Sequence, residues 1–139
     1  IKPDCASAWA LKVIALDNLS RYQEAVQAYD KAIAIKPDDA TAWYNKGAAL
    51  SNLGRYEEAV QTYDKVLEIY PDYAQAWYNK GFALGILGRH VEALLACDMA
   101  IAIKPDYASA WQSKGLALAR LGRRKEARQA FVKASQLCR

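Results

Sequence analysis

The chain contains 139 residues, 53% of them hydrophobic and 24% charged, with a formal net charge of +4 at pH 7. No apolar run approaches the roughly 20 residues of a membrane-spanning helix and no signal peptide is recognisable, so we expect a cytoplasmic protein without a membrane partner. The charge is uneven, because residues 108–139 carry eight Lys/Arg and one Asp/Glu, whereas residues 1–107 carry 11 and 14. Cys5, Cys97 and Cys138 are scattered without ligand spacing, which favours reduced thiols over a disulfide framework or a zinc site.

The first five residues, Ile-Lys-Pro-Asp-Cys, match two later segments that begin at Ile35 and Ile103. We interpret residues 1–5 as the tail of a truncated preceding repeat. Because the chain also lacks an initiator Met, we expect it to be a fragment of a longer protein.

From residue 6 the sequence repeats itself every 34 residues. Several columns of identical residues fall into register at this period: Trp9, Trp43, Trp77 and Trp111; Leu16, Leu50, Leu84 and Leu118; and Arg21, Arg55, Arg89 and Arg123. A repeat array buries its apolar surface between neighbouring units and needs roughly three of them to be stable. The four units found here meet that requirement.

Each unit divides into two amphipathic helices. In the second unit the apolar spacing predicts a helix over residues 42–53, ended by a left-handed Gly54. A second helix is predicted from about Tyr56 to Ile69 and is stopped by Pro71, after which Asp72 is placed to cap the next helix.

Small residues in each unit have a steric role. Gly47 and Ala59 are expected to let the two helices approach closely, with Trp43 and Tyr63 filling the space beside them. The third unit has Cys97 in the column of Tyr63, which we expect to be a buried small hydrophobe.

This period, with Trp at unit position 4, small residues at 8, 20 and 27, an aromatic at 24 and Pro at 32, resembles the tetratricopeptide (TPR) repeat. The resemblance implies an all-α fold, a right-handed α-solenoid of antiparallel helix pairs. The expected repeats cover residues 6–39, 40–73, 74–107 and 108–139, and the last ends in a capping helix. Arg128 and Ser135 support a cap, because they replace apolar residues of the columns expected to meet a following unit.

Charged columns suggest contacts between successive repeats. Aligned aspartates and lysines form three candidate pairs: Asp30–Lys46, Asp64–Lys80 and Asp98–Lys114. The alternative is a set of independent, solvated charges, and the sequence leaves the two open.

In the TPR family the first helix of every repeat faces a concave groove. The positions that match the groove-facing ones are Tyr44, Asn45, Ala48 and Asn52 in the second repeat; Gln75, Tyr78, Asn79 and Phe82 in the third; and Gln112, Leu116 and Arg120 in the fourth. The resemblance therefore implies a peptide-binding groove of aromatic and amide character.

Two specialisations of TPR grooves can be compared with this sequence. The clamp that holds a partner's C-terminal carboxylate is absent, since Ala10, Ile14, Gln75 and Asn79 stand where its other residues should be. Asn45 and Asn79 match two rungs of an asparagine ladder that grips peptide backbone, because an Asn amide both donates and accepts. They are equally consistent with a common solvated version of the repeat.

The sequence favours a non-enzymatic protein–protein interaction scaffold that binds a peptide segment of a partner. A single His, no Gly-rich phosphate loop and no nucleophile motif give no catalytic residue, metal site or cofactor to expect. The groove's single Arg argues against nucleic acid. The basic start of the last helix, Arg123 to Lys125, is read either as a solubilising cap or as a site for an acidic partner.

The alternative function is self-association through exposed repeat ends. Trp9, Val13 and Leu16 lie at i, i+4 and i+7, which predicts an apolar face at the truncated N-terminal end. Two such faces would favour a symmetric head-to-head homodimer.

Overall fold

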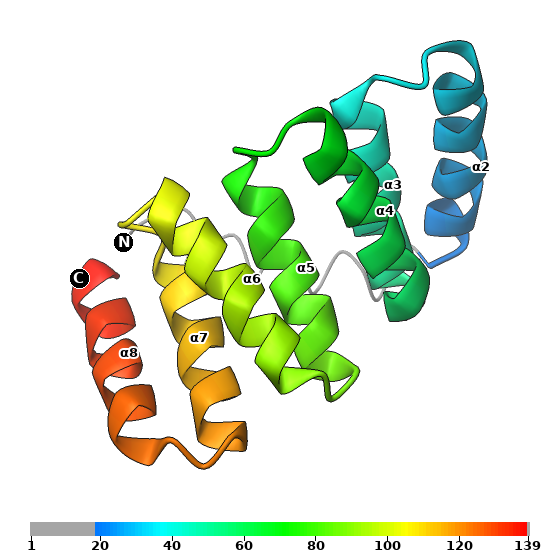
Figure 1. The fold of residues 1–139 in the computed structure, drawn as a ribbon. Helices are drawn as coiled ribbons and strands as arrows, with labels where there is room; N and C mark the ends of the chain where they lie inside the picture. Colours follow the sequence, from blue (N-terminus) through cyan, green and yellow to red (C-terminus); the bar gives the residue numbers. More distant parts are fainter. Residues whose placement is uncertain (1–18, 139) are drawn as a thin grey trace.

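The structure, a computed structural model, describes residues 19–138. Within this range the chain forms seven helices and no strand: α2 (Leu19–Ile35), α3 (Ala40–Asn52), α4 (Tyr56–Ile69), α5 (Ala74–Ile86), α6 (His90–Ile103), α7 (Ala108–Arg120) and α8 (Arg124–Leu137). Each helix packs against the next along the chain, so the helix pairs stack from α2 at one end to α8 at the other (Figure 1). The prediction of an all-α solenoid is confirmed.

The turn inside each helix pair depends on a left-handed glycine. Gly54 has a φ of +77°, and Gly88 and Gly122 repeat it at +80° and +79°. The predicted helix from Tyr56 to Ile69 is confirmed, whereas α3 begins at Ala40, two residues before the predicted start.

The expected helix cap at Asp72 is wrong. The residue that precedes α5 is Tyr73, and it makes no side-chain cap hydrogen bond. The turn after α4 places the cap position one residue beyond Asp72, and only in the first repeat does that column hold an acid. There Asp39 Oδ1 accepts from the backbone N–H of Thr41 at 3.1 Å and of Ala42 at 3.3 Å.

Close helix approach explains the glycine column of the first helices. A Cβ on Gly47 would lie 2.7 Å from Cε1 of the buried Tyr63, and one on Gly115 would lie 2.7 Å from Cδ1 of Phe131. At Gly81 the facing residue is Cys97, a free and fully buried thiol as predicted. Burial raises the pKa of Cys97 to about 12.

Three ion pairs join successive repeats, which confirms the predicted Asp–Lys columns. The Lys Nζ to Asp Oδ1 distances are 2.6 Å for Lys46–Asp30, 2.6 Å for Lys80–Asp64 and 2.8 Å for Lys114–Asp98. Each lysine also lies over the tryptophan three residues before it, with Nζ between 5.3 and 5.5 Å from the ring centroid. The alternative of independent charges therefore does not hold.

The arginine column forms a second set of ion pairs at the start of each second helix. Arg55, Arg89 and Arg123 each make two hydrogen bonds to the glutamate three residues on, Glu58, Glu92 and Glu126. These bonds lower the pKa of each of the three glutamates.

The last repeat differs from the others where the sequence indicated. Arg128 and Ser135 are exposed on α8, whereas Val60 and Leu94 are buried in the column of Arg128. The expectation of three reduced thiols is wrong for Cys138, which is disulfide-bonded.

Some predictions fall outside the described residues. The repeat tail at residues 1–5, and the proposed self-association face of Trp9, Val13 and Leu16, lie before residue 19. Among the described helices none has the length and apolar character needed to cross a membrane. The same part of the chain holds no cluster of potential metal ligands.

Candidate functional site

The first helices of the described repeats lie side by side, because α3 contacts α5 and α5 contacts α7. Every predicted groove residue therefore lies on one of three adjacent helices, in register at the 34-residue period. Some of these side chains lie close together, and some already make hydrogen bonds or ring contacts with neighbouring residues.

A tyrosine cluster joins the second repeat to the third. The ring of Tyr44 stacks on that of Tyr73 with centroids 4.9 Å apart and planes 10° apart, and it lies 6.0 Å from the ring of Tyr63. Asn79 Nδ2 donates a hydrogen bond of 2.9 Å to the Tyr44 hydroxyl. Burial raises the pKa of both Tyr44 and Tyr63, so both phenols remain protonated.

This cluster changes the interpretation of the two predicted asparagine rungs. The Asn79 amide is already engaged, because it donates to the Tyr44 hydroxyl and also makes a side-chain hydrogen bond with Tyr63. Asn45, one turn from the N-terminus of α3, is partly exposed. The two amides are thus not equivalent.

A second aromatic cluster follows in the third repeat. The ring of Tyr78 lies 5.1 Å from that of Tyr107 and 6.5 Å from that of Phe82. Lys104 Nζ lies 4.8 Å from the centroid of the Tyr107 ring. Tyr107 is buried, but Phe82 is 47% exposed, so the cluster extends from the core to the surface.

An open hollow of about 440 Å³ lies between α5 and α7. It brings together Phe82, Leu116 and Arg120 of the predicted groove, with Leu116 52% exposed. Ile86 and Ser113 also line it, and His90 contributes from the start of α6. The walls are mostly apolar, and Arg120 supplies one charge at the edge.

The remaining predicted residues are spread along the helices outside this hollow. Asn52, Gln75 and Gln112 are exposed, and Ala48 is partly exposed. Sequence reasoning missed Tyr73, in the connection before α5, and His90, the first residue of α6. The signal for Tyr73 was available, because an aromatic residue recurs in its column as Tyr107 where the first repeat has Asp39.

Comparison with known protein families gives matches along the whole array. One family model described as a tetratricopeptide repeat matches residues 2–40, 11–74 and 44–108, and a second model with that description matches residues 108–139. Among curated proteins, none matches the chain.

Solved structures of two kinds resemble the chain. A crystal structure of MamA superimposes with a TM-score of 0.80 at 29% identity, covering 84% of this chain and 68% of MamA. MamA from Desulfovibrio magneticus RS-1 gives a TM-score of 0.80 at 31% identity, covering 89% and 70%. The first TPR domain of RPAP3 (Spaghetti), bound to the HSP90 peptide SRMEEVD, gives 0.69 at 26% identity, covering 70% and 78%. The family models, the repeat geometry and these structures agree, and the chain belongs to the tetratricopeptide repeat family.

Proposed function

We propose that this TPR scaffold binds a peptide segment of a partner protein in the groove formed by α3, α5 and α7. The observation that carries the proposal is the hollow of about 440 Å³ in which Phe82 and Leu116 remain about half exposed. Exposed apolar side chains gathered in a concave, mostly apolar site mark a place for a ligand.

The chemistry of the groove favours an apolar peptide whose backbone meets amide groups. The predicted set includes four amides, on the same three helices as its aromatic residues, and one cation, Arg120: the amides are Asn45, Asn52, Gln75 and Gln112. Such amides bind carbonyl and N–H groups of a backbone without selecting its sequence. Apolar side chains of the ligand would enter the hollow between Phe82 and Leu116.

The ligand class differs from that of a structural relative. The RPAP3 domain holds an HSP90 peptide, SRMEEVD. In this chain Gln75 and Asn79 occupy positions where a carboxylate clamp needs other residues, and Asn79 is hydrogen-bonded to Tyr44. We therefore propose an internal peptide segment, with no free C-terminal carboxylate, as the ligand.

A peptide selection tests both points. Peptides selected on the whole chain from a random library would be resynthesised with a free or an amidated C-terminus, and we expect equal affinity by calorimetry. Phe82→Ser together with Leu116→Ser should weaken binding about tenfold or more. Ile35→Ser removes an exposed apolar side chain of α2 and is the matched control.

Two results would overturn the proposal. Loss of binding on amidation would show a clamp for a terminal carboxylate. Affinity that is unchanged in the Phe82→Ser, Leu116→Ser variant would place the ligand outside the groove.

A further inference from the structure

The helix α6 is apolar on both of its faces. Its inner face buries Ala93, Cys97 and Ala100. On the opposite face Val91, Leu95 and Met99 are 60%, 61% and 44% exposed. Because these three residues are spaced i, i+4 and i+8, they form one stripe along the outer side of α6, which we call the α6 stripe.

The other repeats show that the fold does not need this stripe. In the same columns the remaining second helices have Gln23, Gln27 and Lys31 on α2; Glu57, Gln61 and Lys65 on α4; and Lys125, Gln129 and Lys133 on α8. These nine side chains are polar and exposed. Repeat packing therefore tolerates polar residues in all three columns, and it does not explain why the third repeat carries apolar ones.

Beside the α6 stripe lie two lysines without an ion pair among the described residues. Lys125 and Lys133 are exposed on α8, in the columns that hold Val91 and Met99 on α6. On the other side of α6 the charges of α4 are matched: Glu57 contacts Arg89 at 3.3 Å, and Lys65 contacts Glu68 at 3.5 Å. The uncompensated positive charge thus borders the stripe on the α8 side alone.

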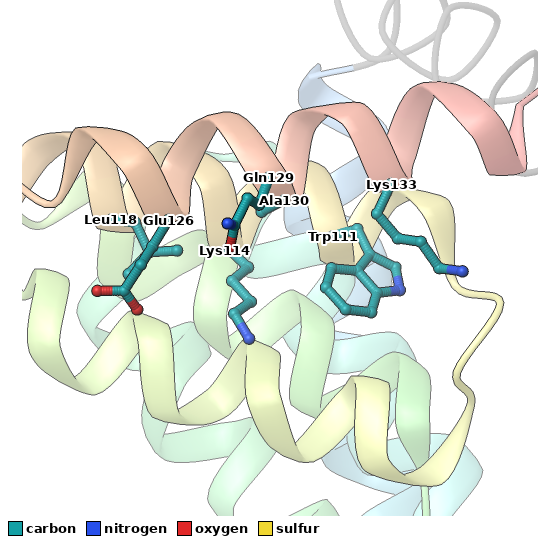
Figure 2. A pocket seen from close by; sticks show the side chains of 7 residues that line it. All are labelled: Trp111, Lys114, Leu118, Glu126, Gln129, Ala130 and Lys133. Atoms are coloured by element: carbon teal, nitrogen blue, oxygen red, sulfur yellow. The ribbon is translucent and has the colours of Figure 1, made fainter.

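A furrow lies between α7 and α8, and Trp111 and Lys114 of α7 and Lys133 of α8 line it. In Figure 2, α8 runs across the top, and the Lys114 side chain extends toward α6 below, where it pairs with Asp98. Its volume is about 300 Å³. Lys114 is held by Asp98 and Glu126 by Arg123, so Lys133 is the lining charge without an ion pair among the described residues.

We propose that the outer face of α6 and α8 binds an acidic amphipathic helix of a partner protein. The partner helix lies along α6, because apolar side chains spaced four residues apart on it match the spacing of Val91, Leu95 and Met99. Its carboxylates face Lys125 and Lys133 of α8. This surface lies on the second helices, so the proposal is independent of peptide binding between α5 and α7.

Charge complementarity selects this occupant over a second copy of the chain. Another copy would present the same stripe beside the same cations. The acids of its α4, Glu57 and Glu68, are already paired with Arg89 and Lys65. A partner helix with unpaired carboxylates beside its own apolar stripe complements both the α6 stripe and the lysines of α8.

The test uses designed peptides of about five helical turns that carry leucines at i, i+4 and i+8. One peptide has glutamates on its other positions, a second has lysines, and a third has the acidic composition in scrambled order. Fluorescence anisotropy with the whole chain should show binding of the acidic amphipathic peptide alone. The affinity should fall as salt rises, because the cations are exposed.

Variants assign the contact to the two helices. Val91→Glu, Leu95→Gln and Met99→Lys together give α6 the residues that α4 already has in these columns, so the fold should be retained. This variant should lose about tenfold or more in affinity, and Lys125→Glu with Lys133→Glu should lose a similar factor. Phe82→Ser, in the groove, is the control and should leave this affinity unchanged.

Four outcomes would overturn the proposal. They are no binding of the acidic amphipathic peptide, equal binding of the lysine peptide, unchanged affinity in the α6 variant, and loss of affinity in Phe82→Ser. Sedimentation tests whether a second copy of the chain covers the α6 stripe instead. A concentration-dependent dimer of the unmodified chain that the α6 variant abolishes would assign the stripe to a second copy instead.

Discussion

At the scale of single residues, the packing of Gly47 against Tyr63 defines the tightest point inside a repeat. The missing side chain leaves room for a ring that is almost fully buried, and Phe131 takes the same place against Gly115. The third repeat uses the smaller Cys97, whose Sγ would lie 3.0 Å from a Cβ on Gly81. Ring and glycine therefore act as a matched pair in two repeats.

We predict that Gly47→Ala destabilises the protein by about 1–3 kcal/mol, because the new methyl group overlaps a ring that is enclosed by the core. Gly85→Ala is the matched control, since a Cβ there meets nothing within 4 Å and alanine favours helix. That control should be neutral or stabilising by up to about 1 kcal/mol. Urea unfolding of both variants measures the difference, and equal stabilities would contradict the packing argument.

The two asparagines of the groove should differ in their effects. Asn45→Ala should weaken peptide binding by about 1 kcal/mol through one lost set of hydrogen bonds. Asn79→Ala should cost more, up to about 3 kcal/mol, because it also releases the Tyr44 hydroxyl. Calorimetric titration of a selected peptide compares the two variants. Circular dichroism should show that helical content is retained, and equal losses would contradict a positioning role for Asn79.

Much of the residue-scale pattern could be predicted, and the failures have specific causes. The glycine, proline and aromatic columns reflect turns and packing contacts that recur in every repeat. The helices and turns of one repeat therefore predict those of the others. The cap at Asp72 failed because the cap position is one residue later and changes identity between repeats. Tyr73 and His90 were missed because the groove positions include only first helices, whereas Tyr73 lies in a connection and His90 begins the second helix α6.

At the scale of helices, two kinds of ion pair have different tasks. The Asp–Lys pairs link the second helix of one repeat to the first helix of the next. The Arg–Glu pairs lie within the first turn of α4, α6 and α8, where an acid suits the helix dipole. Both sets lie at the surface, where water and salt screen ion pairs, and the Arg–Glu pairs are the more exposed of the two.

The Arg–Glu pairs predict a dependence of stability on pH. Hydrogen bonds from the arginines lower the pKa of Glu58, Glu92 and Glu126 in the folded chain. A carboxylate whose folded pKa is depressed stabilises the fold above its unfolded pKa of about 4.3. That stability is lost as pH falls through the lower, folded pKa.

Replacing all three glutamates by Gln should therefore flatten the acid limb of the stability curve. Urea unfolding at about pH 7 and pH 3 should show a smaller change in the variant than in the unmodified chain. High salt should reduce the difference, because the pairs are exposed. Glu24→Gln, on the exposed face of α2, is the control. Identical pH dependence in both proteins would contradict the role of these pairs.

At the scale of the whole molecule, the described repeats have three buried apolar clusters, which follow one another along the array. Leu84 and Leu118 belong to the same buried cluster although they are one period apart, and Trp77 packs on all three clusters. Such a core has no single centre, so each repeat is stabilised by its neighbours. The two faces of the array are then free to differ, with the groove on the first helices and the α6 stripe on the second.

The faces of the array also show where prediction from sequence ends. The groove positions were predicted from the family resemblance, which assigns the same unit positions to the groove in every repeat. The α6 stripe departs from the other repeats, and it is recognised only when exposure on α6 is known. A repeat pattern predicts what is shared between units and leaves their individual surfaces open.

Self-association through Trp9, Val13 and Leu16 stays a prediction, because these residues precede the described range. If they form an open apolar face, sedimentation at increasing concentration should show a dimer. Trp9→Glu should return the chain to a monomer, because a buried carboxylate is costly in an apolar interface. A monomer at every concentration, or a dimer indifferent to Trp9→Glu, would contradict the hypothesis.

The tryptophan column also gives the array an internal optical probe. Trp43, Trp77 and Trp111 each donate from Nε1 to a proline carbonyl of the preceding turn, at 2.8, 2.9 and 2.8 Å, while a lysine ammonium lies over the ring. Opening of one repeat would break both contacts and shift the emission of that indole alone. A set of chains that each keep a single tryptophan, with Phe at the other positions, would therefore report unfolding repeat by repeat. Midpoints that differ along the chain would reveal the order in which the solenoid opens.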